Sequence, residues 1–194
     1  MKKWSDFYDK KLSVRGLIND IVAHIYLIWN VLKYRPRKVL EIGTARGTMG
    51  FFISFFVPKV IGIDNDHELV ERAKQSIKKK NFIIKYADAF NLPFKNKEFN
   101  VVFSQGFIEH FGNEEIKKLI NESLRVTNIV IISVPNNLYG EKDFGNERLL
   151  KHKEWCELFR SLGFNVVKCK SYWPINWKKI FSISKNQTLI IVSR

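Results

Sequence analysis

Cysteine is scarce in this chain of 194 residues, which has only Cys156 and Cys169. They lie far apart in the sequence and form no Cys-x-x-Cys pair, so the sequence indicates neither a zinc site nor a disulfide framework. The simplest interpretation is a reducing, cytoplasmic setting. The segment Met1–Lys11 is polar and charged, unlike a secretory signal peptide.

Uninterrupted apolar runs long enough to cross a bilayer are also missing. The most apolar candidate, Leu17–Leu32, is broken by Asn19, Asp20, His24 and Asn30. It is therefore too short and too polar for a membrane span. We expect a helix packed against the core there.

The chain has no internal repeats and no linkers rich in glycine, proline or serine. Its length is that of one domain with a sizeable core. We expect residues 1–194 to form a single domain, with an N-terminal helical extension over 1–36 and a core over 37–194.

Acidic residues are few, with 19 Asp and Glu against 33 Lys and Arg, which gives a net charge of +14. Such a balance suggests a polyanionic partner: RNA, DNA or an anionic membrane surface. The alternative is composition alone, since a chain rich in Lys, Ile, Asn and Phe is what an A/T-biased genome encodes. The positive charge is diffuse, without a long arginine block.

The most informative segment that is present is Val39–Gly50, V-L-E-I-G-T-A-R-G-T-M-G. A short apolar run ends in an acid and then enters a turn with glycines at Gly43 and Gly47, which is typical of a strand that passes into a helix through a ligand-binding loop. A second apolar run ends about twenty residues later at Asp64, where folds of this kind bind ribose hydroxyls. No lysine follows Gly47, which argues against a nucleoside triphosphate.

Strand and helix patterns alternate along the rest of the chain. We expect strands at Lys38–Ile42, Lys59–Ile63, Phe82–Tyr86, Phe99–Ser104, Ile129–Val134, Val166–Lys170 and Leu189–Val192. We expect helices at Thr48–Phe56, His67–Lys80, Glu114–Val126 and Lys153–Leu162. This alternation favours an α/β fold, a parallel sheet covered by helices on both faces, and the last two strands suit an antiparallel edge pair.

The frame E-x-G-x-A-x-G that starts at Glu41 resembles motif I of the class I S-adenosylmethionine-dependent methyltransferases. Ala45 stands where the family usually has the middle glycine, a departure of one methyl group. The resemblance covers most of the chain from Val39 onward. It implies a Rossmann-like three-layer sandwich with a seven-stranded, mostly parallel sheet whose last strand is antiparallel. It also implies S-adenosyl-L-methionine as cofactor and S-adenosyl-L-homocysteine as product.

The resemblance further assigns cofactor-binding residues, each at the carboxyl end of an expected strand, where such folds bind ligands. They are Glu41, Gly43, Thr44, Ala45, Gly47, Asp64, Asn65, Asp88, Ala89, Gln105, Gly106 and Phe107. Asp64 would accept both ribose hydroxyls, and Asp88 would accept from the adenine amino group. Taken singly, either aspartate could instead be a helix cap or a turn residue.

His110, in a Phe-Ile-Glu-His-Phe stretch, is the histidine nearest to the expected site and a candidate catalytic base. It could equally cap or pack at the start of the next helix. The fourth strand is followed by no Asn/Asp-Pro-Pro-Tyr/Phe and no cysteine nucleophile, which argues against the usual nucleic-acid base methyltransferases. No aspartate lies between Val101 and Phe111, so we expect no metal.

Acceptor specificity in this family lies in the N-terminal extension and in the loops after the fifth and sixth strands. Here these are Trp4–Gly16, Pro135–Arg148 and Tyr172–Lys185, in which aromatic residues alternate with basic ones. This pattern suits a small-molecule acceptor that is anionic or aromatic, or a stacked base; a solvated hydrophobic lid is the alternative. An RNA- or ribosome-directed methyltransferase and a non-catalytic cofactor-binding scaffold remain as further hypotheses, and the oligomeric state stays open.

Overall fold

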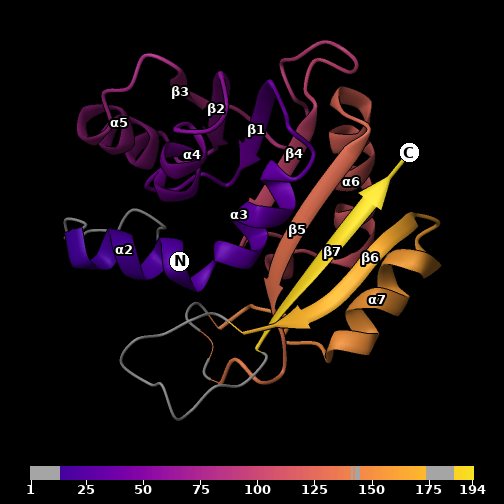
Figure 1. Ribbon diagram of the computed structural model, residues 1–194. Coiled ribbons are helices and arrows are strands. Elements are labelled where there is room, and N and C mark those ends of the chain that lie inside the picture. The colour runs from indigo at the N-terminus through magenta and orange to yellow at the C-terminus, as the bar shows by residue number, and fades with distance from the viewer. Residues whose placement is uncertain (1–13, 141, 143–144, 174–185) are drawn as a thin grey trace.

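The computed structural model describes residues 14–140, 142, 145–173 and 186–194, which contain a seven-stranded sheet in the order β3-β2-β1-β4-β5-β7-β6 (Figure 1). The strands are β1 (Lys38–Ile42), β2 (Lys59–Asp64), β3 (Phe82–Tyr86), β4 (Val101–Gln105), β5 (Ile129–Pro135), β6 (Asn165–Tyr172) and β7 (Gln187–Ser193). β7 runs antiparallel to both of its neighbours, β5 and β6, while the other pairs are parallel. The expected mostly parallel sheet with a reversed last strand is confirmed.

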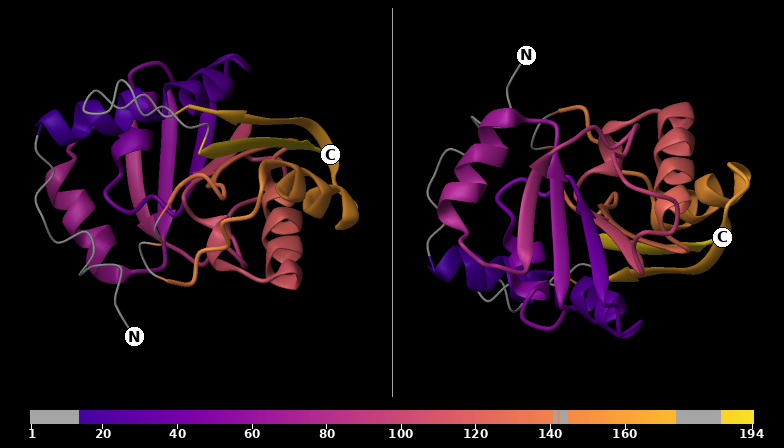
Figure 2. Two further views of the ribbon diagram at one scale, coloured as in Figure 1. Left: turned by 90° about the horizontal axis from the view of Figure 1, so that it is seen from below. Right: turned by 90° about the horizontal axis from the view of Figure 1, so that it is seen from above.

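Helices cover both faces of this sheet (Figure 2). They are α2 (Val14–Ala23), α3 (Ile25–Leu32), α4 (Thr48–Ile53), α5 (His67–Ser76), α6 (Asn113–Val126) and α7 (His152–Ser161), with a single 3-10 turn, η1 (Ile108–His110). Buried residues of α3, α4 and α5 pack with one face of the sheet, and those of α6 and α7 pack with the other. The expected α/β three-layer sandwich is confirmed.

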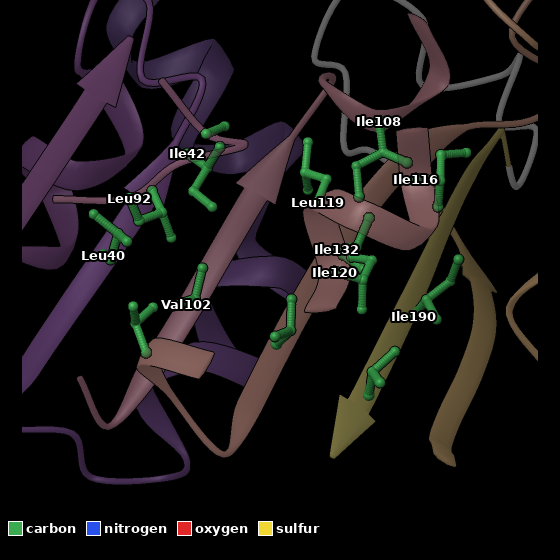
Figure 3. Packing of buried hydrophobic residues seen from close by; sticks show 14 of the residues in the cluster. Leu40, Ile42, Leu92, Val102, Ile108, Ile116, Leu119, Ile120, Ile132 and Ile190 are labelled. Carbon is green, nitrogen blue, oxygen red and sulfur yellow. The ribbon is translucent and has the colours of Figure 1, made fainter. Parts of the chain in front are cut away.

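Side chains alternate in direction along each strand, which explains why the buried residues form two clusters, one on each face of the sheet. In β1, Val39 packs with α3 and α4, whereas Leu40 and Ile42 belong to the cluster on the α6 and α7 side (Figure 3). Successive side chains of a strand point to opposite faces, so a strand buried on both faces must be apolar throughout. The one buried polar residue of β1 is Glu41, near the carboxyl end of the strand, and it belongs to the site described below.

Three of the expected helices differ from the structure by more than one residue. The helix expected over Leu17–Leu32 is two helices, α2 and α3, that meet at His24, whose backbone leaves the helical region. α4 ends at Ile53 instead of Phe56, and the chain continues as a turn in which the N–H groups of Phe56 and Val57 both donate to the Ile53 carbonyl. α5 ends at Ser76, where Ile77 becomes extended and packs toward the core. No helix in the described part of the chain is long and apolar enough to span a membrane.

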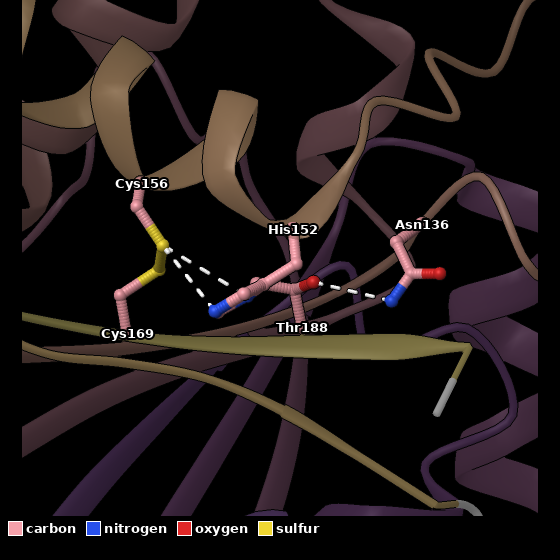
Figure 4. The surroundings of a disulfide bond; sticks show 5 residues. All are labelled: Asn136, His152, Cys156, Cys169 and Thr188. Carbon is pink, nitrogen blue, oxygen red and sulfur yellow. Dashed lines mark hydrogen bonds between the residues drawn. A yellow bond between two sulfur atoms is a disulfide. The ribbon is translucent and has the colours of Figure 1, made fainter. Parts of the chain in front are cut away.

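The expectation that the two cysteines are unpaired is wrong. Cys156 on α7 and Cys169 on β6 form a disulfide, with their Cα atoms 5.9 Å apart (Figure 4). The pairing arises because α7 packs along β6, a tertiary contact that the spacing of 13 residues does not reveal.

Candidate cofactor site

The loop between β1 and α4 turns through left-handed backbone. Gly43, Ala45 and Gly47 have φ angles of 69°, 45° and 76°. A Cβ atom on Gly43 would stand 2.6 Å from the ring of Phe107, so glycine is required where this loop meets the one after β4. Ala45 adopts the same region with a side chain, and its N–H donates to Asp64 Oδ2 at 2.9 Å. The loop is thereby fixed to the end of β2.

Glu41 lies buried beneath the glycine loop. Its Oε2 accepts hydrogen bonds from the Thr44 hydroxyl at 2.6 Å and from the Gly50 N–H at 3.0 Å. Burial raises the pKa of Glu41 to about 8, although both hydrogen bonds act to lower it. The carboxyl group therefore holds the loop from inside.

Asp64 ends β2 beside the same loop. Its Oδ2 accepts from Ala45 N–H, and its Oδ1 accepts from Asp66 N–H at 3.0 Å. Burial raises its pKa, while these backbone hydrogen bonds act against the rise. The Asn65 N–H also acts on this carboxylate, which has about four lone-pair positions, so the group can still accept from a ligand hydroxyl.

A cavity of about 420 Å³ opens where the carboxyl ends of β1, β2 and β4 face the N-terminal helices. Its volume lies in the range of small-molecule sites, about 300–1,000 Å³. The sequence-predicted residues that line it are Glu41, Gly43, Thr44, Ala45, Asp64, Asn65, Gln105, Gly106, Phe107 and His110. Lining residues that the sequence did not single out are Asp20, His24, Arg46, Thr48, Met49, Leu69, Phe111 and Asn146.

A smaller recess of about 20 Å³ contains the other predicted acid. Asp88 and Ala89 line it after β3, and Asp88 Oδ1 accepts from the Phe90 N–H at 2.9 Å. The recess shares Asp64 and Phe107 with the large cavity, so the two hollows adjoin. All but one of the predicted cofactor residues thus line one of two neighbouring hollows.

Gly47 is the exception. A Cβ atom there would lie 2.9 Å from Ile77 Cδ1, inside the core, and Gly47 lines neither hollow. Its N–H donates to the Thr44 carbonyl at 2.7 Å. Its position therefore indicates that it shapes the loop, and direct cofactor contact stays a prediction.

His110, the predicted base, lies on the wall of the cavity. Its Nδ1 is 2.9 Å from Asn146 Oδ1. An amide oxygen only accepts, so this contact is a hydrogen bond in the tautomer that carries its proton on Nδ1. The segment with Asn146 is held against η1 by Arg148, whose N–H donates to the Glu109 carbonyl and whose guanidinium donates to the Phe111 carbonyl, both at 2.9 Å.

His24 is a second histidine at the cavity, and the sequence did not indicate it. Its Nδ1 lies 3.2 Å from the Tyr172 hydroxyl, which is 2.7 Å from Ser133 Oγ. Burial lowers the pKa of His24 to about 4, so the ring is neutral near pH 7. The partners of His24 come from β5 and β6, more than 100 residues away, so no local pattern could have found this arrangement.

Parts of two expected acceptor regions, with Trp4, Phe7, Tyr8, Trp177 and Phe181, lie outside the described residues. In the third region, Asn146 reaches the cavity.

Comparisons with known proteins agree with this geometry. Residues 39–128 match a family model described as a methyltransferase domain. Over 92 residues the chain is 29% identical to the uncharacterized methyltransferase YcgJ of Bacillus subtilis (strain 168). That alignment covers 46% of this chain and 36% of YcgJ, so the chain matches about a third of the relative's length.

Solved structures share the fold over nearly the whole chain. The PH0226 protein from Pyrococcus horikoshii OT3 aligns with a TM-score of 0.77 at 18% identity, over 100% of this chain and 99% of that one. A SAM dependent methyltransferase from Aquifex aeolicus aligns with a TM-score of 0.70 at 18% identity, over 99% and 98%. A chain from a complex of the Haloferax volcanii Trm112 methyltransferase activator with a methyltransferase gives 0.73 at 15%, over 98% and 95%.

The match to the methyltransferase-domain model covers a little under half of the chain, and the fold over nearly the whole chain is that of the solved structures named above. The family model spans β1 to the end of α6, the part of the fold that carries the glycine loop and the acids of β1, β2 and the loop after β3.

Metal ligands were not expected in this chain, and the structure does not test that expectation at the cavity. Among the described residues, His152, Cys156 and Cys169 form a group whose donor atoms all lie within 4.8 Å of one another. None of the three lines the cavity.

Proposed function

We propose that this protein transfers a methyl group from S-adenosylmethionine to a small-molecule acceptor that is anionic or aromatic. The observation that carries the proposal is the cavity, because the glycine loop, Asp64 and the loop after β4 line it together. The cofactor supplies an electrophilic methyl group on its sulfonium. Transfer to a nucleophile then depends mainly on positioning, and on removal of a proton where the acceptor carries one.

The cofactor-binding role rests on the chemistry of the two hollows. The Asp64 carboxylate at the end of β2 suits the hydroxyls of a ribose, and its charge disfavours a 2′-phosphate there. Asp88 and the backbone of Ala89 line the adjoining recess, which suits an adenine edge. Gln105, Gly106 and Phe107 line the side of the cavity that faces β4, where we place the sulfonium.

The acceptor side of the proposal rests on aromatic and basic side chains. The rings of Phe107 and Phe111 have centroids 5.1 Å apart and both line the cavity, which suits a planar or apolar acceptor. Arg46 lines the same cavity and favours an anionic group. His110 is the candidate base, in the tautomer that carries its proton on Nδ1 beside Asn146.

An RNA- or ribosome-directed methyltransferase is the second candidate, and the net charge of +14 favours it. The Haloferax volcanii structure is a complex with an activator protein. It suggests the further hypothesis that this chain also binds a protein partner. RNA binding through several phosphate contacts would weaken steeply as salt rises, whereas diffuse charge gives weak binding without preference. A filter-binding series over salt concentration separates these two cases.

The test of cofactor use is calorimetric binding of S-adenosylmethionine and S-adenosylhomocysteine to wild type and to Asp64→Ala. Hydrogen bonds to charged groups contribute about 1.5–3 kcal/mol each, so loss of the ribose contacts should weaken binding at least about tenfold. Asp66→Asn is the matched control, because Asp66 lies two residues away, lines neither hollow, and asparagine also caps α5. Equal binding by wild type and Asp64→Ala would refute the assigned role, and no binding by wild type would refute the enzyme.

A further inference from the structure

A second chemical site lies between α7 and the edge strand β6. His152 and Cys156 come from α7, and Cys169 comes from β6 (Figure 4). The Cys156 sulfur is 3.8 Å from Nδ1 and 3.9 Å from Nε2 of His152. The group includes both cysteines of the chain, and it lies on the part of the sheet away from the cofactor cavity.

Local geometry explains why these three side chains converge. His152 and Cys156 are four residues apart in one helix, so they occupy the same face, the spacing at which helices commonly present two metal ligands. Cys169 points to the face of the sheet that α7 covers, and it packs against the same core cluster as Trp155 and Phe159. The preceding Lys168 reaches the opposite face, where it donates to Asn30 at 3.0 Å.

The distance between Cys156 and His152 suits a tetrahedral site for a soft divalent cation, and the two sulfurs, which are bonded here, would have to separate on reduction to complete it. Zinc bonds of about 2.3 Å to sulfur and about 2.0 Å to nitrogen place neighbouring ligand atoms roughly 3.5–3.8 Å apart. The sulfur–nitrogen distances of 3.8 and 3.9 Å are close to that range. Cys156 is buried, whereas His152 and Cys169 are only half-buried, so a fourth position would face solvent.

We propose that the reduced form of this pair, together with His152, binds Zn²⁺ or a similar soft cation. A dithiol reductant supplies two electrons and two protons to the disulfide, yields two thiols and is itself oxidised to a disulfide. Cation binding then releases two protons, because the ligands are thiolates, and leaves the site neutral. The disulfide and the metal site are alternative ways to link α7 to β6, and the proposal does not depend on the identity of the methyl acceptor.

Spectroscopic titration with Co²⁺ tests the site. Reduced, metal-free wild type should bind one equivalent, with the visible bands of tetrahedral Co²⁺ and a near-ultraviolet thiolate charge-transfer band, and Zn²⁺ should displace it. Cys169→Ser should remove most of the charge-transfer intensity, and His152→Ala should weaken binding at least tenfold. His67→Ala, which changes an exposed histidine on α5, should bind like wild type.

The oxidised wild-type protein is the control, because both of its cysteines are in the disulfide, and it should not give the thiolate band. The proposal is overturned if reduced wild type gives no thiolate band with excess Co²⁺. It is also overturned if Cys169→Ser and the oxidised protein give the same spectrum as reduced wild type. Addition of Zn²⁺ should raise the melting temperature of the reduced protein only, because a ligand of the native state stabilises it.

Discussion

Glu41→Gln should change how the stability of this protein depends on pH. The native pKa of Glu41 is about 8, against an ordinary value of 4.5, because the side chain is buried. The native state therefore binds the proton more tightly than the unfolded chain does. The stabilisation from this group is fully present below pH 4.5 and is lost as pH rises through 8.

The size of the effect follows from the pKa difference. Each unit corresponds to about 1.4 kcal/mol, so wild type should lose about 3 kcal/mol between pH 5.5 and 7.5 from this group alone. Glutamine stays neutral, and its carbonyl oxygen can accept from Thr44 and Gly50 as Glu41 Oε2 does. The Gln variant should therefore lack this loss, and its stability relative to wild type should rise with pH.

Urea unfolding of both proteins at several values between pH 5 and 8 measures the difference directly. Burial also raises the pKa values of Asp20 and Asp64. Both proteins retain these groups, so their contributions to the pH dependence of the unfolding free energy largely cancel in the comparison. Glu157→Gln, at an exposed position of α7, controls for the loss of one carboxylate. If the wild-type and Glu41→Gln stabilities run parallel over this range, the assignment of a protonated, buried Glu41 is wrong.

Further substitutions test the loop, a cap and the core. Gly43→Ala, at a φ of 69° and against Phe107, should cost at least about 1–2 kcal/mol in urea unfolding. It should also weaken S-adenosylhomocysteine binding in calorimetry. Asp66→Ala removes a cap that accepts from two backbone N–H groups of α5 and should cost about 1 kcal/mol in urea, whereas Asp66→Asn should cost little. Phe159→Ala, in the core under α7, should cost about 3–5 kcal/mol and lower the melting temperature; a change below 1 kcal/mol would contradict its burial.

Much of the fold and of the cofactor site could be predicted because its signals are local. The glycine loop follows β1 directly, and Asp64 and Asp88 follow the ends of β2 and β3. Carboxyl ends of neighbouring parallel strands meet at one edge of a sheet, so the alternating pattern alone was enough to bring these residues together. Helix ends were less predictable. The charged sequence after Ser76 favours a helix that continues to Lys80, but Ile77 packs toward the core in an extended conformation and α5 ends before it.

The sequence by itself determined the layer order of the fold and the acids that meet the glycine loop, because hydrophobic periodicity and turn chemistry act over a few residues. Only the tertiary structure decided which side chains complete the walls. His24 meets Tyr172 across 148 residues, and His110 meets Asn146 across 36. The pairing of Cys156 with Cys169 likewise depends on α7 lying along β6. Such contacts depend on how helices and strands pack. The free energy of packing depends on both contacting surfaces, which come from segments far apart in the sequence, so a short segment alone does not predict it.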